Sequence, residues 1–464
     1  MNIYNTLSKQ VEKFTPNEEG IVKMYTCGPT VYHYAHLGNL RTYVFEDVLE
    51  KALEYVGYDV IRVMNLTDVG HIVGDADEGE DKMAKSAKRE GKSAWEIAEF
   101  YTRAFFSDAD KLNIRKPAIT EKATDHIDMY IRMIEKLVEE GYAYKASGNI
   151  YFDVTKAPDY YKLSGKNPDE LIIGVRDSVE EDKSKRNPAD FVLWFTNSKF
   201  ENQEMIWDSP WGKGYPGWHI ECSGIAGRFL GEYLDIHCGA IDAVFPHHTN
   251  EIAQSEAYYG HKWCNYWIHG EHLNDSTGKM SKSKGTFLTL SLLEEKGYNP
   301  LSYRYYCLSS HYRNQLVFTW EGLESAEQAY KKLKNKIKQL NREPDLHAKE
   351  ADAYQAKFKE AIENDLNTSS MMTILYDVLK DDSLTDFTKL FLVDDFDKVL
   401  SLSLIEEEKT ITSEVEDMIL KKIEERKQAK INKDYALADK IRDELFDEGI
   451  RLVDTKEKTT YEIM

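Results

Sequence analysis

The stretch from residue 21 to residue 64 most limits what this chain can fold into. Residues 21–27 alternate as a strand does and end at Gly28-Pro29, which breaks the run. Apolar residues then recur at helical spacing over 44–56, and residues 60–64 form a second strand-like run. A strand, a helix and a strand in this order make a βαβ unit, so the sequence predicts a parallel sheet.

Beyond this unit the pattern changes several times along the 464 residues. Short strand-like runs at 149–154 and 191–194 replace the alternation of helix and strand, which resumes between residues 220 and 269. After Tyr303 helical segments dominate, and from Glu414 onward two charged helices precede one strand-like run. A chain of this length holds about two to four domains. The sequence predicts an α/β protein with a β-containing insertion between two halves, then a helical bundle and a small C-terminal module.

Composition excludes several classes of protein. Lys and Arg number 60 against 81 Asp and Glu, a net charge of −21, so a general nucleic-acid coat is excluded and a polyanion must bind through local patches. No apolar run reaches the ~18 residues of a membrane span, and residues 1–6 lack the features of a signal peptide. We therefore expect a soluble, cytoplasmic protein. The five scattered cysteines do not form a disulfide framework and are expected to be thiols or metal ligands.

The string His36-Leu37-Gly38-Asn39 follows the first strand and begins the predicted helix. A helix N-terminus presents unpaired backbone N–H groups and partial positive charge, and glycine lets a phosphate come close to the backbone. His36 and Asn39 can add hydrogen-bond donors. These features favour a phosphate site, but Asn39 can also simply cap the helix, and the string alone does not decide between the two.

A second string, Lys279-Met280-Ser281-Lys282-Ser283-Lys284, places three lysines between Gly278 and Gly285. Lysines on a flexible loop can stabilise the charge that develops on a departing pyrophosphate, because contacts that strengthen in the transition state accelerate a reaction. The alternative is a solvated basic loop with no part in the chemistry.

Cys222, His247 and Glu251, with Cys27 at the end of the first strand, form a candidate metal set. His247 and Glu251 are four residues apart at the start of a predicted helix, so both side chains leave the same face. Two thiolates, an imidazole and a carboxylate suit tetrahedral zinc. Three further residues compete for the same role: Cys238, His237 and His248. At this point buried structural thiols explain the cysteines equally well.

The strings at 36–39 and 279–283 occur together in the order and spacing of one family. On these residues the chain resembles the class I aminoacyl-tRNA synthetases, in which a His-x-Gly-His or His-x-Gly-Asn string and a downstream Lys-Met-Ser-Lys-Ser string frame a Rossmann-type ATP site. Within that class it is similar to the cysteinyl-tRNA synthetases, on residues 26–32, 190–194, 209–212, 216–223, 235–239 and 245–251. The resemblance covers essentially the whole chain.

The resemblance implies which residues bind the metal and the amino acid. The implied ligands of one zinc ion are Cys27, Cys222, His247 and Glu251. Zinc would select the substrate because it prefers a thiolate to a hydroxyl. The residues implied to bind the cysteine substrate are Gly28, Thr67, Trp218 and Asp242, with Asp242 on the ammonium group.

The resemblance also implies an ATP site, with Mg²⁺ accompanying the nucleotide. The residues implied to bind ATP are His36, Gly38, Asn39 and Lys282, and those implied to act in catalysis are His36, Asn39, Lys279 and Lys282. Asn39 stands where many members of the family have a histidine, which keeps a hydrogen-bond donor and removes a titratable group.

The fold and reaction follow from the same resemblance. We expect a Rossmann-like parallel-sheet catalytic domain split by an insertion, followed by a helical bundle and a small α+β C-terminal module. The expected regions are 1–115 and 206–275 (catalytic halves), 116–205 (insertion), 276–320 (lysine loop and stem contact), 321–402 (bundle) and 403–464 (linker and anticodon-binding module). The implied reaction joins L-cysteine to its cognate tRNA, tRNA(Cys), through a cysteinyl-adenylate, in a monomer that does not bind a membrane.

Three alternative functions are compatible with different parts of this set of motifs. A cysteine ligase of thiol-cofactor biosynthesis has a similar catalytic half, but the region from Glu414 onward argues against it. A catalytically silent tRNA-binding paralogue would lose the two ATP strings, which are intact here. A zinc hydrolase is disfavoured because His247 and Glu251 are not joined by a second helical histidine at the usual spacing.

Overall fold

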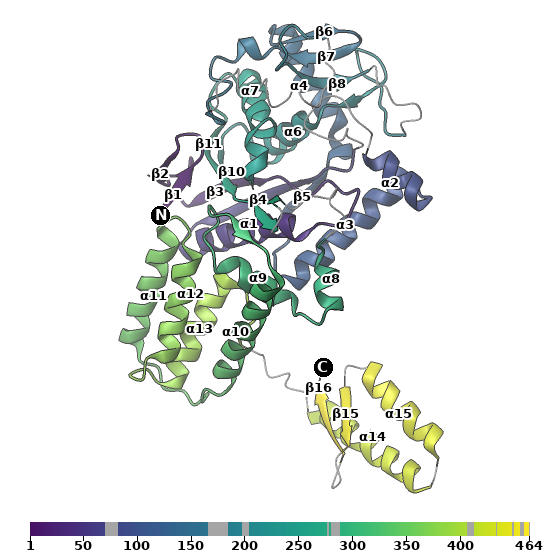
Figure 1. Ribbon diagram of the computed structural model, residues 1–464, viewed down its shortest axis with the longest axis vertical. Helices are drawn as coiled ribbons and strands as arrows, with labels where there is room; N and C mark the ends of the chain where they lie inside the picture. The colour runs from purple at the N-terminus through teal and green to yellow at the C-terminus, as the bar shows by residue number, and fades with distance from the viewer. Residues whose placement is uncertain are drawn as a thin grey trace. The chain divides into compact units, whose positions relative to one another are not determined.

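A parallel sheet with the strand order β11-β10-β3-β4-β5 lies at the centre of the computed structural model (Figure 1). Its strands are β3 (Ile21–Thr26), β4 (Asp59–Leu66), β5 (Ile119–Lys122), β10 (Leu234–Ala240) and β11 (Cys264–Gly270). β3 and β4 pair from Ile21 with Asp59 to Thr26 with Met64. This pairing confirms the βαβ unit that the alternating runs predict.

The structure describes residues 1–69, 82–165, 184–196, 204–275, 278–279, 288–405, 413–432, 434–447, 450–454 and 459–463. They fall into two units, Met1–Ile405 and Glu406–Met464. Within these described residues, every helix is too short or too polar to cross a membrane.

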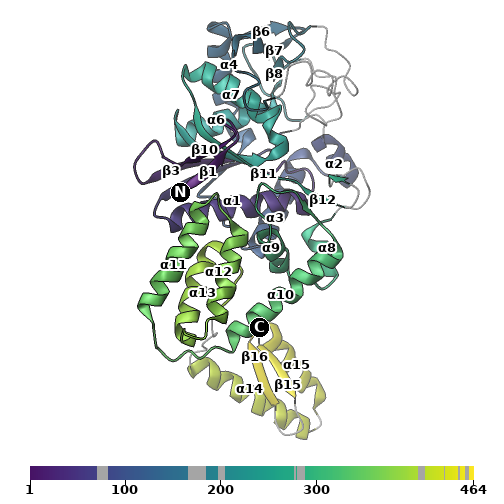
Figure 2. The ribbon, with the colours of Figure 1, turned by 60° about the vertical axis from the view of Figure 1, so that its left-hand side comes forward.

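The direction of winding reverses between β3 and β10. From β3 the chain passes through α1 (Leu37–Tyr55) to β4 on one side, and from β10 through α7 (His247–Tyr259) to β11 on the other. Because crossovers between parallel strands are right-handed, α1 and α7 lie on opposite faces of the sheet, as Figures 1 and 2 show. Open α/β sheets bind ligands beyond the carboxyl ends of their strands at such a reversal.

Between β4 and β10 the chain adds helices and an antiparallel sheet. The helices are α2 (Lys82–Glu90), α3 (Ala94–Lys111), α4 (Ile127–Glu139) and α6 (Trp218–Leu230). The antiparallel sheet has the order β6-β7-β8-β9, with β6 (Ala143–Ala146), β7 (Asn149–Phe152), β8 (Phe191–Phe195) and β9 (Tyr215–Pro216). Helix α3 begins with a capping box. The Ser93 side chain accepts a hydrogen bond from the Glu96 backbone N–H, and the Glu96 side chain accepts one from the Ser93 backbone N–H.

The rest of the larger unit is mostly helical. Its helices are α8 (Leu290–Glu295), α9 (Pro300–Leu308), α10 (Trp320–Lys338), α11 (Ala348–Glu363), α12 (Thr368–Lys380) and α13 (Asp386–Leu400). Small strands accompany them: β12 (Leu273–Asp275), β13 (Gly278–Lys279) and β14 (Leu316–Val317), with a hairpin of β1 (Asn2–Asn5) and β2 (Gln10–Lys13) at the N-terminus. The sequence did not predict this hairpin.

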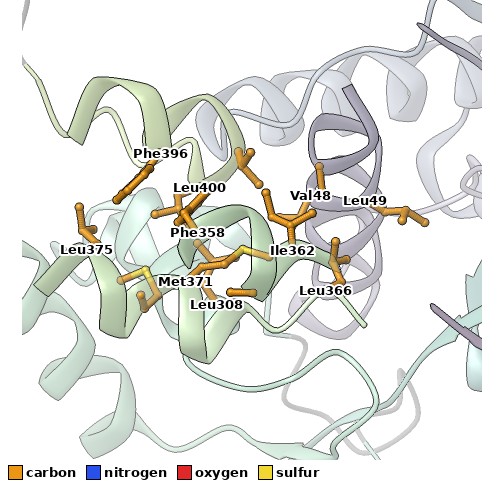
Figure 3. Close-up of a cluster of buried hydrophobic side chains, with 14 of the residues drawn as sticks. Val48, Leu49, Leu308, Phe358, Ile362, Leu366, Met371, Leu375, Phe396 and Leu400 are labelled. Atoms are coloured by element: carbon orange, nitrogen blue, oxygen red, sulfur yellow. The ribbon is translucent and has the colours of Figure 1, made fainter. Parts of the chain in front are cut away.

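The helical region and the parallel sheet share one apolar core. Val48 and Leu49 on α1 pack into the same cluster as Phe358 on α11 and Phe396 on α13 (Figure 3). The rings of Phe358 and Phe396 are stacked, with centroids 4.1 Å apart. The helix that connects β3 to β4 is therefore also a wall of the bundle.

A buried arginine reinforces this junction. Arg304 on α9 is fully buried and its Nη2 lies 2.6 Å from Asp47 Oδ2 on α1. Its other nitrogens donate to the carbonyl oxygens of Leu400, at the end of α13, and of Leu112, just after α3. One guanidinium thus connects four segments of the larger unit.

The end of the larger unit differs from the expected linker. The sequence places a linker from residue 403 onward, but Leu404 is buried in the shared core together with Leu402. The hydroxyl of Tyr330 also donates to the Leu402 carbonyl. The segment therefore belongs to the bundle as far as Ile405, where the larger unit ends.

The smaller unit has its own apolar core. It contains α14 (Ser413–Ile431), α15 (Tyr435–Asp447) and an antiparallel pair of β15 (Ile450–Asp454) and β16 (Thr459–Ile463). Ile419, Ile441, Leu445 and Ile450 form the core. The two helices and the first strand agree with the sequence prediction, whereas β16 was not predicted.

Candidate active site

Four potential metal ligands meet beyond the carboxyl ends of β3 and β10. Cys27 follows β3, Cys222 lies on α6, and His247 and Glu251 stand one turn apart on α7. Their donor atoms all lie within 4.8 Å of one another. The sheet and two helices thus bring together residues that are far apart in the sequence.

Two histidines outside this set of four, His219 and His237, contact its side chains. The Nδ1 atoms of His219 and His247 are 2.8 Å apart, and His247 Nε2 faces Cys222 Sγ at 3.5 Å. His237 Nε2 lies 2.8 Å from Glu251 Oε2, and the other oxygen of that carboxylate lies 3.0 Å from His247 Nε2. Holding one atom of a side chain in this way orients its other atom for a metal.

The charges of this cluster concentrate negative potential at its centre. Burial would raise the pKa of Glu251, but the positive charges of His237 and His247 outweigh it and lower that pKa to about 2. Burial would lower the pKa of His247, but the negative charges of Glu251 and Cys222 raise it to about 10. Burial also opposes ionisation of Cys222, yet its hydrogen bond with Cys27 and the charge of His247 lower the pKa of Cys222. These interactions favour the ionised carboxylate of Glu251 and the thiolate of Cys222.

A second set of donors overlaps the first. The ligand atoms of Cys27, His237, His248 and Glu251 also lie within 4.8 Å of one another. His248 Nε2 is 3.2 Å from Cys27 Sγ, and its Nδ1 is 2.8 Å from a nitrogen of His269. Of the three rivals named from the sequence, His237 and His248 therefore reach the centre. Cys238 belongs to neither set and lies in the shared apolar core.

The residues present fit a metal ion by their chemistry. Thiols, imidazoles and a carboxylate are the ligands that zinc takes in proteins. Within the described part of the chain, Glu251 Oε1 is a buried acceptor without an aligned hydrogen bond, and buried acceptors are normally satisfied. A metal ion in contact with this oxygen would satisfy it.

A cavity of about 390 Å³ is lined in part by Cys27, Cys222 and His247. The residues expected to bind an amino acid, Gly28, Thr67, Trp218 and Asp242, all line it. The ring of Trp218 lies 4.5 Å from that of His247, centroid to centroid. The expected amino-acid residues and the expected metal ligands thus border one space.

Gly28 occupies a position where a side chain has no room. A Cβ there would lie 1.6 Å from the Asn65 carbonyl oxygen on β4. The Gly28 N–H donates to Asn65 Oδ1 at 2.9 Å, and Asn65 Nδ2 donates to Thr67 Oγ1 at 3.0 Å. Asn65 therefore positions both Gly28 and Thr67 in the cavity wall.

His36 and Asn39 cap α1 reciprocally. His36 is the N-cap, and its Nδ1 accepts a hydrogen bond from the Asn39 N–H at 3.1 Å. Asn39 Oδ1 accepts from the His36 N–H in return, at 3.3 Å. The capping that the sequence left open is therefore present, with His36 rather than Asn39 as the cap. Asn39 also lines the cavity, and a Cβ at Gly38 would lie 3.0 Å from the His36 ring.

The lysine string begins beside the start of α1. The backbone of Lys279 lies on β13, which pairs with β12 at Asn274. A Cβ at Gly38 would be 3.9 Å from Leu273 on β12, and the Leu37 N–H donates to the Leu288 carbonyl after the string. Both ends of the lysine-rich segment are thus next to α1. Lys282 lies outside the described residues.

Two residues of the site were not anticipated from the sequence. Asn65 is an amide inside the apolar run of β4, and that contrast was a usable signal. His219 follows Trp218 on α6, and nothing in its spacing indicates that it contacts His247. Its role depends on the packing of α6 against α7, which a sequence pattern does not contain.

Solved structures with the same fold support the fold class. A methionyl-tRNA synthetase of Mycobacterium tuberculosis, bound by methionyl-adenylate, is 14% identical with a TM-score of 0.55. The match covers 82% of this chain and 88% of that one. At this identity the likeness shows the fold alone, the Rossmann-like class I synthetase architecture that the motifs imply.

Sequence comparison identifies the family. Residues 13–328 match the family described as tRNA synthetases class I (C) catalytic domain. A cysteine–tRNA ligase of Treponema denticola is 48% identical over 489 residues, covering 99% of each chain. Another from Borrelia turicatae is 42% identical over 476 residues, covering 99% of this chain and 98% of that one. The chain belongs to the cysteine–tRNA ligase family of the class I aminoacyl-tRNA synthetases.

Proposed function

We propose that the protein joins L-cysteine to tRNA(Cys) in two ATP-driven steps, with zinc selecting the substrate thiol. The observation that carries this proposal is the Cys27, Cys222, His247 and Glu251 cluster at the end of a cleft that also contains the start of α1. A centre suited to bind sulfur and a helix N-terminus suited to bind phosphate, within one cavity, match the needs of cysteine activation by ATP.

In the first step the carboxylate of cysteine attacks the α-phosphorus of ATP. A new oxygen–phosphorus bond forms, the bond to the bridging oxygen breaks, and pyrophosphate leaves with its electron pair. The start of α1, with His36, Gly38 and Asn39, would hold the phosphates of ATP and Mg²⁺, while Lys279 and Lys282 would stabilise the departing charge. The reaction needs no side-chain nucleophile, because positioning and charge stabilisation suffice.

The cavity wall would orient the amino acid for that attack. Asp242 would pair with the substrate ammonium group, while Gly28, Thr67 and Trp218 would enclose the rest of it. Bound zinc would supply a Lewis acid that prefers the substrate thiolate to a serine hydroxyl. A site built around a required polar partner rejects the analogue that lacks it by about 10⁴–10⁵.

In the second step a ribose hydroxyl of the terminal tRNA adenosine attacks the cysteinyl carbonyl, and AMP leaves. We propose that the enzyme carries out both steps as a monomer in the cytoplasm, where translation takes place.

We propose that the unit Glu406–Met464 binds the anticodon. Helix α14 carries a basic run, Lys421, Lys422, Arg426, Lys427 and Lys430. This run is partly neutralised, because Lys422 pairs with Glu444 and Lys427 with Glu424. Recognition of unstacked loop bases and RNA shape is therefore favoured over general electrostatic attraction.

Amino-acid-dependent exchange of pyrophosphate into ATP tests the proposal. We expect exchange with cysteine and strongly reduced exchange with serine, in a screen of all twenty amino acids without tRNA. Charging of tRNA(Cys) then tests the second step. Exchange that requires another amino acid would refute the substrate. Exchange with cysteine but transfer to an amino sugar instead of tRNA would establish the thiol-cofactor ligase alternative.

A further inference from the structure

An aromatic surface borders the cleft, and the proposed function leaves it without a role. Tyr34, between β3 and α1, lines the cavity and is 39% exposed. Its ring meets Tyr101 of α3 edge to face, with centroids 5.1 Å apart, and lies 6.1 Å from Phe100. Tyr101 in turn stacks on His33. One buried ring, Tyr101, and two partly buried rings, Phe100 and His33, thus surround the exposed ring of Tyr34 in the cavity wall. An exposed aromatic ring of this kind can stack on a nucleic-acid base.

This surface lies on the β4 side of the cleft. The Val31 N–H donates to the Thr67 carbonyl just after β4, and Ser86 on α2 donates to the Tyr32 carbonyl. The backbone of Lys279 on β13 lies on the other side, because β13 pairs with β12, which follows β11 at the opposite edge of the sheet. If ATP and cysteine use the start of α1 and Asp242, the wall that carries Tyr34 is left for a second substrate.

Positively charged side chains lie beside the wall that carries Tyr34, although the chain as a whole has a net charge of −21. Between residues 82 and 92 the sequence contains five cations, Lys82, Lys85, Lys88, Arg89 and Lys92, against the single acid Glu90. Lys88 is exposed, and Lys92 Nζ lies 4.4 Å from the centre of the Phe100 ring. Arg89 Nη2 lies 3.3 Å from Tyr101 Oη. Cations interleaved with aromatic rings are typical of surfaces that bind single-stranded nucleic acid.

We propose that this wall binds the single-stranded 3′ end of the tRNA, with the terminal adenine stacked on Tyr34 and adjacent phosphates beside Lys88 and Lys92. The inference rests on the proposed function, which requires a tRNA end to enter the cleft. Stacking of the base on Tyr34 would leave its ribose facing the cavity that Tyr34 and Trp218 both line. The occupant is RNA rather than an acidic protein segment, because the surface combines an exposed ring with cations.

Tyr34→Ala and Tyr34→Phe test the stacking. Affinity is measured for two transcripts of tRNA(Cys), one intact and one that lacks the terminal adenosine. Tyr34→Ala should weaken binding of the intact RNA by about 5- to 100-fold and of the shortened RNA by about twofold or less, while Tyr34→Phe should retain binding. Tyr233→Ala is the matched control, because Tyr233 is 49% exposed but precedes β10, at the end of the strand away from the cleft.

A second measurement separates tRNA from ATP as the ligand of Tyr34. In Tyr34→Ala, charging of tRNA should fall at least about tenfold more than cysteine-dependent pyrophosphate exchange. A parallel fall in both reactions would assign Tyr34 to ATP and overturn the proposal. Equal loss of affinity for the two transcripts, or no loss for either, would also overturn it.

The cations are tested by the salt dependence of binding. Lys88→Gln combined with Lys92→Gln should reduce the slope of log affinity against log salt concentration by about one to two, because each phosphate contact releases counterions. An unchanged slope would remove these lysines from the RNA surface. If the unmodified protein binds tRNA(Cys) through Tyr34 but shows no exchange with cysteine, the proposed function fails while the RNA surface stands.

Discussion

His237 holds the outer oxygen of Glu251: the His237 Nε2 atom lies 2.8 Å from Glu251 Oε2, and both side chains are fully buried. The contact connects β10 to α7 at the point where the strand order reverses. Because one oxygen of the carboxylate is engaged, the other is turned toward His247. A strand residue thus orients a ligand that a helix supplies.

His237→Asn should lower the affinity for zinc by about 10- to 100-fold, the usual effect of removing a partner that orients a ligand. Competition with a chromophoric zinc chelator measures this affinity. His261→Asn is the control, because His261 is a partly exposed histidine that stacks on Tyr233. Unchanged affinity in His237→Asn would contradict the orienting role.

Replacement of Cys222 distinguishes the two overlapping sets of donors. Cys222→Ala should lose both the zinc and the affinity for cysteine, because Cys222 belongs only to the first set. Cys238→Ala should retain zinc, since Cys238 is a fully buried thiol of the apolar core. Metal analysis gives about one zinc per chain where the site is intact. Zinc that persists in Cys222→Ala and is lost in His248→Ala would identify the second set instead.

The pKa of Asp68 predicts how the free energy of unfolding changes with pH. The residue is buried and accepts hydrogen bonds from the backbone and hydroxyl of Thr124, at 3.0 and 2.7 Å. Burial raises its pKa from 3.8 to about 6, so the folded protein binds this proton more tightly than the unfolded chain does. The resulting stabilisation is fully present below about pH 4 and is lost as the pH rises through about 6.

Asp68→Asn removes this titration. Relative to the variant, the unmodified protein should lose up to about 3 kcal/mol of unfolding free energy between about pH 4 and pH 7, since one pKa unit corresponds to ~1.4 kcal/mol. Urea unfolding at a series of pH values measures the difference. Parallel pH profiles for the two proteins would show that Asp68 does not titrate in this range.

Truncation after Ile405 separates the two units at their boundary. The shortened protein should keep most of its cysteine-dependent pyrophosphate exchange and lose most of its tRNA charging, because the proposed anticodon contacts are removed. Undiminished charging would show that the smaller unit has no part in tRNA binding.

A cut five residues earlier, after Leu400, is the matched control for stability. It also removes Leu402 and Leu404, which are buried in the shared core. Loss of buried leucines should lower the unfolding free energy by several kcal/mol, since Leu→Ala alone typically costs about 2–5 kcal/mol. Equal stability of the two truncated proteins would contradict the packing of this segment.

The sequence predicted the elements whose patterns are local. The βαβ unit over residues 21–64 follows from alternation and helical spacing, and the resumed alternation between residues 220 and 269 corresponds to α6, β10, α7 and β11. The end of the bundle was not predictable in this way. Leu402 and Leu404 alternate with serines and resemble a linker, and only their packing against α10 and α13 places them in the core.

The candidate site was predictable in outline for a related reason. His247 and Glu251 share a helix face by spacing alone, so their pairing needed no tertiary information. The partners that orient them, His219 and His237, lie on other elements, and a single sequence contains no signal for those contacts. The structure brings both His247 and its neighbour His248 to the cluster, in two overlapping sets of donors, so neither the motif nor the spacing chooses between them.

The buried guanidinium of Arg304 couples the local unfolding of helices in the larger unit. Arginine cannot lose its charge, so separating it from Asp47 leaves a buried guanidinium without its carboxylate partner. Local opening of α1 breaks that pair, and opening of the end of α13 removes the Leu400 carbonyl that accepts a hydrogen bond from the same guanidinium. We therefore expect the amide hydrogens of these two helices to exchange as one cooperative unit. Helix α1, which begins at the proposed ATP-binding string, is thus stabilised by a helical bundle. The helices of that bundle lie more than 200 residues further along the sequence.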